Sequence, residues 1–478
     1  EDNYFFHRKK MNDPKDSKKS EEMPNYGAVS DSKSDKKRKY NSTQKVSLLA
    51  LAIGEFCAGS LASLQAPFFP AEAEKKGATA AEYGLIFGVY HITIVLTAPL
   101  IGKLVGPLTP KFILNTGFFV LGITSILFGV LDFVKKSGEF IALAFVVRTC
   151  EGVAASCIRI AAGTIVASQF QENVGATYAI LEMCLGVANI LGPVLGGALY
   201  ELGGFQLPFF CIGTVILIDA VVIMFLLPEA ERKEKQPTKF RNIFKVWMKP
   251  KILIFAFSIF STSSFIGYMV VGLEPHTRQT DLSKFYIGLL FSSCGLIYAI
   301  SSPFWGWLHD RMCRSTVINL VGSIFFITAV LLVGPVPFIP LEPSICLIGL
   351  AMTSMGFAAG SKTVSCFTGA LYSAKNYGFP DDLGTYGIIT SIITSSKALG
   401  SAFGPSIGGV ILDTWGFRYG TVLYLVIELT MVAFLSVIIM TEKGGSKLFR
   451  TPEKDKYKSF DIAISLDSKS VVKNDQKN

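Results

Sequence analysis

The chain has 478 residues and a formal net charge of +9 at pH 7; half of its residues are hydrophobic and only 17% are charged. A soluble domain carries about 25% charged residues, whereas the mean hydropathy of this chain is +0.45. The composition therefore excludes an ordinary soluble globular domain and indicates a membrane protein.

Long apolar segments follow one another along the middle of the chain. Each is about 20 residues long, which is enough to cross a hydrocarbon core roughly 30 Å thick. The breaks between them carry proline, glycine or clustered charges. We therefore predict an all-α membrane protein with twelve transmembrane helices near 46–70, 82–106, 111–133, 139–168, 174–200, 207–228, 251–273, 285–307, 316–334, 344–371, 384–411 and 417–440.

Lysine and arginine gather in three segments outside these spans, namely 1–45, 229–250 and 441–478. The first and last also contain few large apolar residues, which predicts disordered tails. The positive-inside rule places all three segments, and so both termini, in the cytosol. We expect them to contact anionic membrane lipid and to bind no nucleic acid, because they lack an aromatic-studded domain.

A sequence repeat divides the chain into two halves. The pattern Gly-Pro-x-x-Gly-Gly begins at Gly192 and again at Gly404, 212 positions later, and Pro99 and Pro303 each begin a copy of Pro-x-x-Gly-x-Leu. The matching stretches occur in the same order in both halves. This predicts pseudo-symmetric six-helix halves at 46–228 and 251–440, joined by a basic cytosolic linker at 229–250.

The two glycine-proline motifs are expected to pack helices and to seal one side of a transport path. Proline inside a helix removes a hydrogen bond and kinks the helix. Glycine lets a neighbouring backbone approach closely where lipid gives no hydrophobic driving force. Packing alone is the alternative. The motif residues are Gly192, Pro193, Gly196, Gly197, Gly404, Pro405, Gly408 and Gly409.

Charged side chains inside the spans are the sharpest indication of function. Each costs roughly 2.5–3.5 kcal/mol at the bilayer centre, so it needs a partner or a water-filled cavity. Internal ion pairing, for example of Arg148 with Glu151 or Glu182, is the alternative for any single residue. We predict a substrate and proton pathway formed by Glu55, His91, Arg148, Glu151, Arg159, Glu182, Asn189, Lys362 and Lys397.

Glu182 is the first candidate in this set for a proton-linked or cation-binding carboxylate. A glutamate in apolar surroundings can change its charge state near the working pH. His91 lies within a predicted span, and its imidazole could relay protons or simply be hydrogen-bonded.

The loop after the second span of the second half resembles a signature of the major facilitator superfamily. Its residues are Gly306-x-Leu-x-Asp310-Arg311. The first-half copy contains Gly102 but has Gly106 where the aspartate would stand. The resemblance implies a cytosolic gate formed by Gly102, Gly306, Asp310 and Arg311, with Asp310 contacting neighbouring helix ends.

Further motifs narrow the resemblance. Arg148-x-x-x-Gly152 and the motif at Gly192 resemble signatures of proton-coupled antiporters within that superfamily. The segment APFFPAEAEKKGA, which begins at Ala66, and the segment ISSP are most similar to the vesicular amine transporter family, closest to its polyamine-transporter branch. This resemblance implies the major facilitator fold, with substrate bound near the midplane between the halves.

The function that this resemblance implies is secondary active transport by alternating access. The protein would exchange a small organic cation, a polyamine or another amine, for protons across an intracellular vesicle membrane or the plasma membrane. Two alternatives stay open: transport of an organic anion or zwitterion held by Lys362 and Lys397, and a non-transporting solute sensor on the same fold. We expect a monomer that is not an enzyme, with no catalytic residue, no metal site and no cofactor apart from the proton as coupling ion.

Overall fold

The computed structural model describes residues 40–65, 68–227, 245–277, 284–334, 336–340 and 344–444. Most of both predicted tails and of the predicted linker therefore lies outside the described residues. The described helices belong to one compact unit that begins at Asn41.

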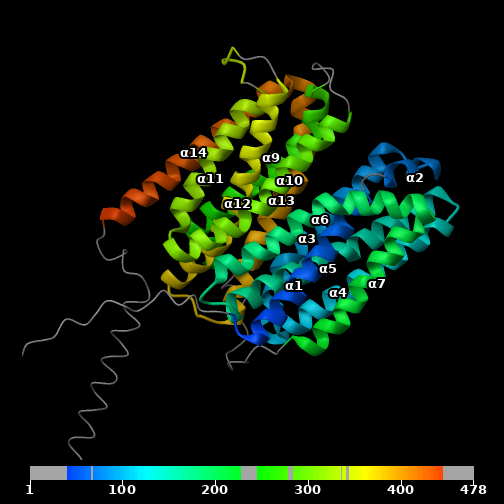
Figure 1. Cartoon of the computed structure of the whole chain (residues 1–478), viewed down its shortest axis with the longest axis horizontal. Coiled ribbons are helices and arrows are strands. Elements are labelled where there is room, and N and C mark those ends of the chain that lie inside the picture. Colours follow the sequence, from blue (N-terminus) through cyan, green and yellow to red (C-terminus); the bar gives the residue numbers. More distant parts are fainter. Residues whose placement is uncertain are drawn as a thin grey trace, which may run out of the picture. The chain divides into compact units, whose positions relative to one another are not determined.

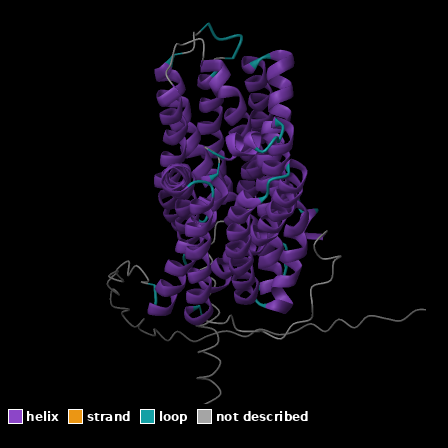
Figure 2. Ribbon diagram, turned by 90° about the vertical axis from the view of Figure 1, so that its right-hand side faces the viewer, coloured by secondary structure: helices purple, strands orange, loops and turns teal. Residues whose placement is uncertain are grey.

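The described residues form helices joined by short loops (Figures 1 and 2), so the prediction of an all-α fold is confirmed. A short helix α2 (Phe69–Lys75) and a 3-10 turn (Leu131–Phe133) accompany twelve long helices. The long helices are α1 (Ser42–Leu64), α3 (Ala80–Leu108), α4 (Pro110–Val130), α5 (Ser137–Gln169), α6 (Val174–Gly203), α7 (Gln206–Leu226), α9 (Pro250–Thr277), α10 (Lys284–Met312), α11 (Ser315–Val333), α12 (Ile345–Asn376), α13 (Leu383–Trp415) and α14 (Phe417–Gly444).

Ten of these helices are long and apolar enough to cross a membrane, when the described residues are searched. The other two are α10 and α13. Polar residues interrupt both helices: Ser301 and Ser302 lie in α10, and Ser395, Ser396 and Lys397 lie in α13. Both also pack against helices of the opposite half. Ser395, Ser396 and Lys397 lower the hydropathy of α13, and the arrangement is consistent with the predicted twelve spans.

The two halves repeat the same helix pairings. In the first half α1 packs on α6, α3 on α5, and α4 on both α5 and α7. In the second half α9 packs on α13, α10 on α12, and α11 on both α12 and α14. Each pairing in the first half matches the pairing six spans later, as expected for a duplicated unit. The boundaries at 228 and 250 stay predictions; residue 228 lies outside the described residues, and α9 begins at Pro250.

Several helices begin where the sequence supplies a capping side chain. Asn41 and Gln44 form a reciprocal capping box at the start of α1, and Thr79 and Glu82 form another at α3. Asp382 accepts a hydrogen bond from the backbone nitrogen of Thr385 at 2.8 Å. These contacts satisfy backbone donors that a helix N-terminus otherwise leaves unpaired.

The glycines of the repeated motif lie in two equivalent helix seams. A Cβ at Gly196 of α6 would overlap the backbone carbonyl of Leu64 in α1, and one at Gly404 of α13 would overlap that of Ser264 in α9. Gly197 differs, since a Cβ at this position would meet no atom within 4 Å. Pro193 and Pro405 lie inside the same two helices. Gly196 and Gly404 therefore each face the neighbouring helix.

Candidate functional site: a polar cavity between the halves

A cavity of about 260 Å³ lies between the two halves. Helices α1, α3, α5 and α6 form its first-half wall, and α13 forms its second-half wall. The volume is slightly below the roughly 300–1,000 Å³ of drug-sized pockets, so it suits a small solute. Of the predicted pathway residues, it is lined by Glu55, His91, Arg159, Glu182, Asn189 and Lys397.

Glu182 is bonded to the opposite half across this cavity. The Lys397 ammonium donates to Glu182 Oε2 at 2.8 Å, which joins α6 to α13. The Tyr298 hydroxyl, from α10, donates to the same oxygen, and Tyr178 lies close enough on α6 to interact with the carboxylate. The Lys397 side chain is 25% exposed and that of Glu182 only 7%. One first-half carboxylate is thus held by two second-half helices.

Glu55 and Arg159 line the same cavity without a close ion pair. Among the described residues, neither has an oppositely charged partner within 4.0 Å. Arg159 nevertheless interacts electrostatically with Glu55 and Glu182, and its guanidinium group lies beside the phenol of Tyr90. His91 packs edge-on against Tyr90, with ring centroids 5.1 Å apart.

Arg148 and Glu151 do not line this cavity. Their side chains form an ion pair at 2.6 Å, and both are almost fully buried in the first half. The Arg148 guanidinium also lies 4.9 Å from the ring centroid of Tyr90. With its amide oxygen turned towards Arg148, Gln65 accepts two hydrogen bonds, at 2.7 and 3.0 Å. This geometry corresponds to the internal pairing that the sequence left open for these two residues.

Lys362 also lies away from the cavity. It forms an ion pair with Glu428 of α14, and both side chains are fully buried. Its ammonium lies 4.7 Å from the ring centroid of Phe326. Glu428 is not among the predicted residues, although a glutamate within the apolar span 417–440 is a readable signal. Asp219 of α7, which is 4% exposed, is not among them either.

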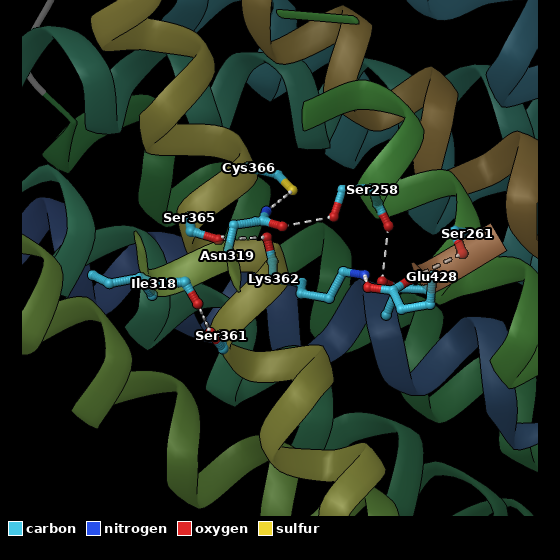
Figure 3. A network of polar contacts seen from close by, with 10 residues as sticks. Ser258, Ser261, Ile318, Asn319, Ser361, Lys362, Ser365, Cys366 and Glu428 are labelled. Atoms are coloured by element: carbon cyan, nitrogen blue, oxygen red, sulfur yellow. Dashed lines mark hydrogen bonds and ion pairs between the residues drawn. The ribbon is translucent and has the colours of Figure 1, made fainter. Parts of the chain in front are cut away.

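The Lys362–Glu428 pair belongs to a buried polar network that connects four helices of the second half (Figure 3). The Ser258 hydroxyl of α9 donates to Asn319 of α11 at 3.0 Å. Asn319 in turn donates to Ser365 of α12 at 3.2 Å. The network therefore fixes α9, α11, α12 and α14 to one another, which is how polar groups are tolerated inside a membrane.

Asp310 joins the two halves at one end of their interface. Its carboxylate accepts hydrogen bonds from the backbone nitrogens of Gly175 at 2.8 Å and Ala176 at 2.7 Å. These donors lie at the N-terminus of α6, where a negative charge is favoured by the helix dipole. A Cβ at Gly306 would lie 2.6 Å from the Cβ of Ala179. The Arg311 guanidinium instead lies over the Trp307 ring, at 4.5 Å.

Gly102 brings α3 against α13 at the same end. A Cβ at this position would lie 2.7 Å from the carbonyl oxygen of Gly387. By contrast, a Cβ at Gly84 or Gly88 of α3, or at Gly197 of α6, would meet no atom within 4 Å. These three glycines lie nearer the other end of the two helices. Close glycine contacts between the halves therefore occur at the end that carries Asp310, which the predicted orientation makes the cytosolic end.

At the end of the molecule opposite Asp310, charged and phenolic side chains hold the short helix α2 in place by hydrogen bonds and ion pairs. Lys76 donates to the backbone carbonyl of Asp132 at 2.6 Å. Burial alone would raise the pKa of the Glu72 carboxyl, but hydrogen bonds from Lys75 and Tyr200 lower it below its usual value. Glu72 therefore stays ionised and holds α2 against the end of α6 at ordinary pH.

Two six-helix sets with repeated pairings and a charged cavity between them define a membrane transporter fold. The chain belongs to the Major Facilitator Superfamily, whose sequence profile matches residues 51–379 and 278–472. This is a family of transporters and not of enzymes, and the chain is a multi-pass membrane protein.

The similar proteins agree with this assignment. The chain is 34% identical to the mouse MFS-type transporter SLC18B1 over 75% of this chain and 78% of that protein. It is 26% identical to the bovine synaptic vesicular amine transporter over 71% of this chain and 62% of that protein. The crystal structure of the human organic anion transporter MFSD10 (TETRAN) matches with a TM-score of 0.69 and 16% identity, over 83% of this chain and 100% of the other. That last likeness concerns the fold alone.

Proposed function

We propose that this protein is a secondary active transporter that exchanges a small organic cation, an amine, for protons by alternating access. The contact of Glu182 with Lys397 and Tyr298 carries the proposal, because it joins the two halves at the wall of the cavity. The synaptic vesicular amine transporters, by their name, carry amines, which supports this substrate class. An intracellular vesicle membrane fits the same relatives, and both termini would be cytosolic.

The charges suggest how proton and substrate would exchange. When Glu182 is ionised, it holds Lys397 and so holds α6 to α13. A proton on Glu182 removes the negative charge that attracts Lys397, which loosens this contact between the halves. A substrate ammonium group would compete with Lys397 for the same carboxylate, and Glu55 offers a second carboxylate in the cavity. Proton and amine would therefore occupy Glu182 alternately.

The first experiment measures net flux in proteoliposomes with a proton gradient. Radiolabelled tetraethylammonium is a suitable probe, together with labelled amines, because a quaternary ammonium cannot cross lipid as a neutral base. Proton-driven uptake supports the proposal. Binding without net flux would instead support a solute sensor, the alternative left open by the sequence.

Replacing Glu182 tests the coupling step. Glu182→Gln should abolish proton-driven uptake yet retain exchange of internal for external substrate, because the amide resembles the protonated acid but releases no proton. Glu139→Gln, at an acid whose side chain is 58% exposed and paired with Lys136, is the matched control and should transport like the wild type. Normal proton-driven uptake by Glu182→Gln would remove Glu182 from the mechanism.

A further inference from the structure

The charged groups of the cavity are balanced. Its walls carry two carboxylates, Glu55 and Glu182, and two cations, Arg159 and Lys397. With His91 neutral, their formal charges cancel. A solute with one ammonium group leaves this cavity with a net charge of +1, as a proton on Glu182 does. A diamine would leave +2, and uncompensated charge is costly in a low-dielectric site.

Within the part of the chain that the structure describes, Arg159 is the cation of this cavity that is not held by a carboxylate. Lys397 is engaged by Glu182 at 2.8 Å, whereas Arg159 has no carboxylate within 4.0 Å among the residues that the structure describes. The guanidinium group lies beside the Tyr90 phenol at the cavity wall. Guanidinium carries several donors in a planar fork and no acceptor, so it binds carboxylates and other acceptors and repels ammonium groups.

We propose that Arg159 determines substrate specificity by binding a hydrogen-bond acceptor at the end of the substrate opposite its ammonium group. The preferred solute is then a small amine with one ammonium group and a hydroxyl, carbonyl or carboxylate at its other end, and diamines are disfavoured. The inference rests on the proposed function, in which the ammonium group binds at Glu55 or Glu182. It also assigns the anionic end of a zwitterion to Arg159, because Lys362 lies away from the cavity and Lys397 is paired with Glu182 in this structure.

Four compounds with one carbon skeleton test the proposal. Butylamine, 4-aminobutan-1-ol, 4-aminobutanoate and 1,4-diaminobutane differ only in the group at the far end. Dissociation constants are measured on the purified full chain from the ligand-dependent rise in melting temperature. We expect the amino alcohol and the amino acid to bind more tightly than butylamine, and the diamine to bind about tenfold or more weakly than the amino alcohol, because repulsion by one close charge amounts to at least this factor.

Two variants assign the effect to Arg159. Arg159→Gln should abolish the preference for 4-aminobutanoate over butylamine and improve diamine binding. Arg159→Lys keeps the positive charge and should still disfavour the diamine. A general loss of structure would weaken all four compounds together and would not change their order.

The outcomes separate this inference from the proposed function. If the diamine binds the wild type as tightly as the amino alcohol, or if Arg159→Gln leaves the order unchanged, the role of Arg159 is refuted while amine transport stands. If none of the four compounds binds and no proton-driven uptake occurs, both proposals fail.

Discussion

Two lysines of the same half have different surroundings, although both lie in apolar spans. Lys397 pairs with Glu182 beside the cavity and its side chain is 25% exposed, whereas Lys362 and Glu428 are fully buried. A buried pair gains little over apolar residues of similar size, but losing one partner leaves an uncompensated charge. Lys362 is therefore expected to stabilise the second half, and Lys397 to take part in transport.

Removing one partner of the buried pair should destabilise the protein strongly. We expect Lys362→Met to lower the free energy of unfolding by about 3–5 kcal/mol, because Glu428 is left buried and unpaired. Reversible unfolding of the purified protein in mixed detergent micelles measures this. The double variant Lys362→Met/Glu428→Leu should recover most of the loss, since both charges are gone.

Transport by the double variant separates stability from mechanism. If it folds and transports with the wild-type preference for charge, the pair is structural. A Lys362→Met variant as stable as the wild type would contradict the prediction.

At the level of helices, the glycine seams show how the repeated motif works. Gly192 and Gly196 let α6 lie against α1, as Gly404 and Gly408 let α13 lie against α9. Membrane helices associate through such close packing because lipid tails are as apolar as their side chains. The same seams lie in α6 and α13, the helices that carry Glu182 and Lys397.

Neighbouring glycines of one motif should respond differently to alanine. Gly196→Ala places a methyl group against the Leu64 carbonyl, and overpacking of this kind costs about 1–3 kcal/mol. Gly197→Ala meets no atom within 4 Å and should be neutral or stabilising by up to about 1 kcal/mol, since alanine favours a helix. Melting temperatures of the two variants check this; equal losses would argue against the seam.

At the scale of the whole molecule, the two halves contact each other at the end that carries Asp310. At Gly84, Gly88 and Gly197, which lie nearer the opposite end, a Cβ would meet no atom within 4 Å. Asp310 bonds α10 to α6, and Gly102 lies against α13. The structure therefore corresponds to a state closed on the predicted cytosolic side. In the proposed alternating-access mechanism, these contacts would break and re-form during transport.

Replacing Asp310 should shift this equilibrium towards the cytosol-open state. Asp310→Asn removes a negative charge at the N-terminus of α6, which is worth about 1–2 kcal/mol in a partly buried site and corresponds to a population change of about 5- to 30-fold. A cysteine introduced as Thr394→Cys at the cavity wall, with the native cysteines replaced, should react faster with a membrane-impermeant thiol reagent added on the cytosolic side. Transport should slow correspondingly.

Gly106→Ala is the control for this experiment. A Cβ there meets the Cα of Gly384 at 3.6 Å, an ordinary contact, so gating should change little. Unchanged labelling and transport in Asp310→Asn would show that this residue does not hold the gate.

The sequence by itself determined the features that depend on local pattern. Apolar segments of about 20 residues specify membrane helices wherever they occur, because every backbone group in lipid must be satisfied within the segment. The repeated Gly-Pro-x-x-Gly-Gly motif indicated the duplication, and the helix pairings repeat accordingly. The charges Glu55, Arg159, Glu182 and Lys397 stand out in the sequence because they interrupt apolar spans, and they line one cavity.

Only the tertiary structure decided which charge meets which. Glu182 and Lys397 are 215 positions apart, and their contact depends on how α6 and α13 are rotated. Lys362 and Thr363 are neighbours in sequence, yet Lys362 contacts Glu428 while Thr363 lies near Tyr298. Successive residues of a helix point about 100° apart. The face that each residue presents, and so its partner, is therefore set by the packing of all the helices together.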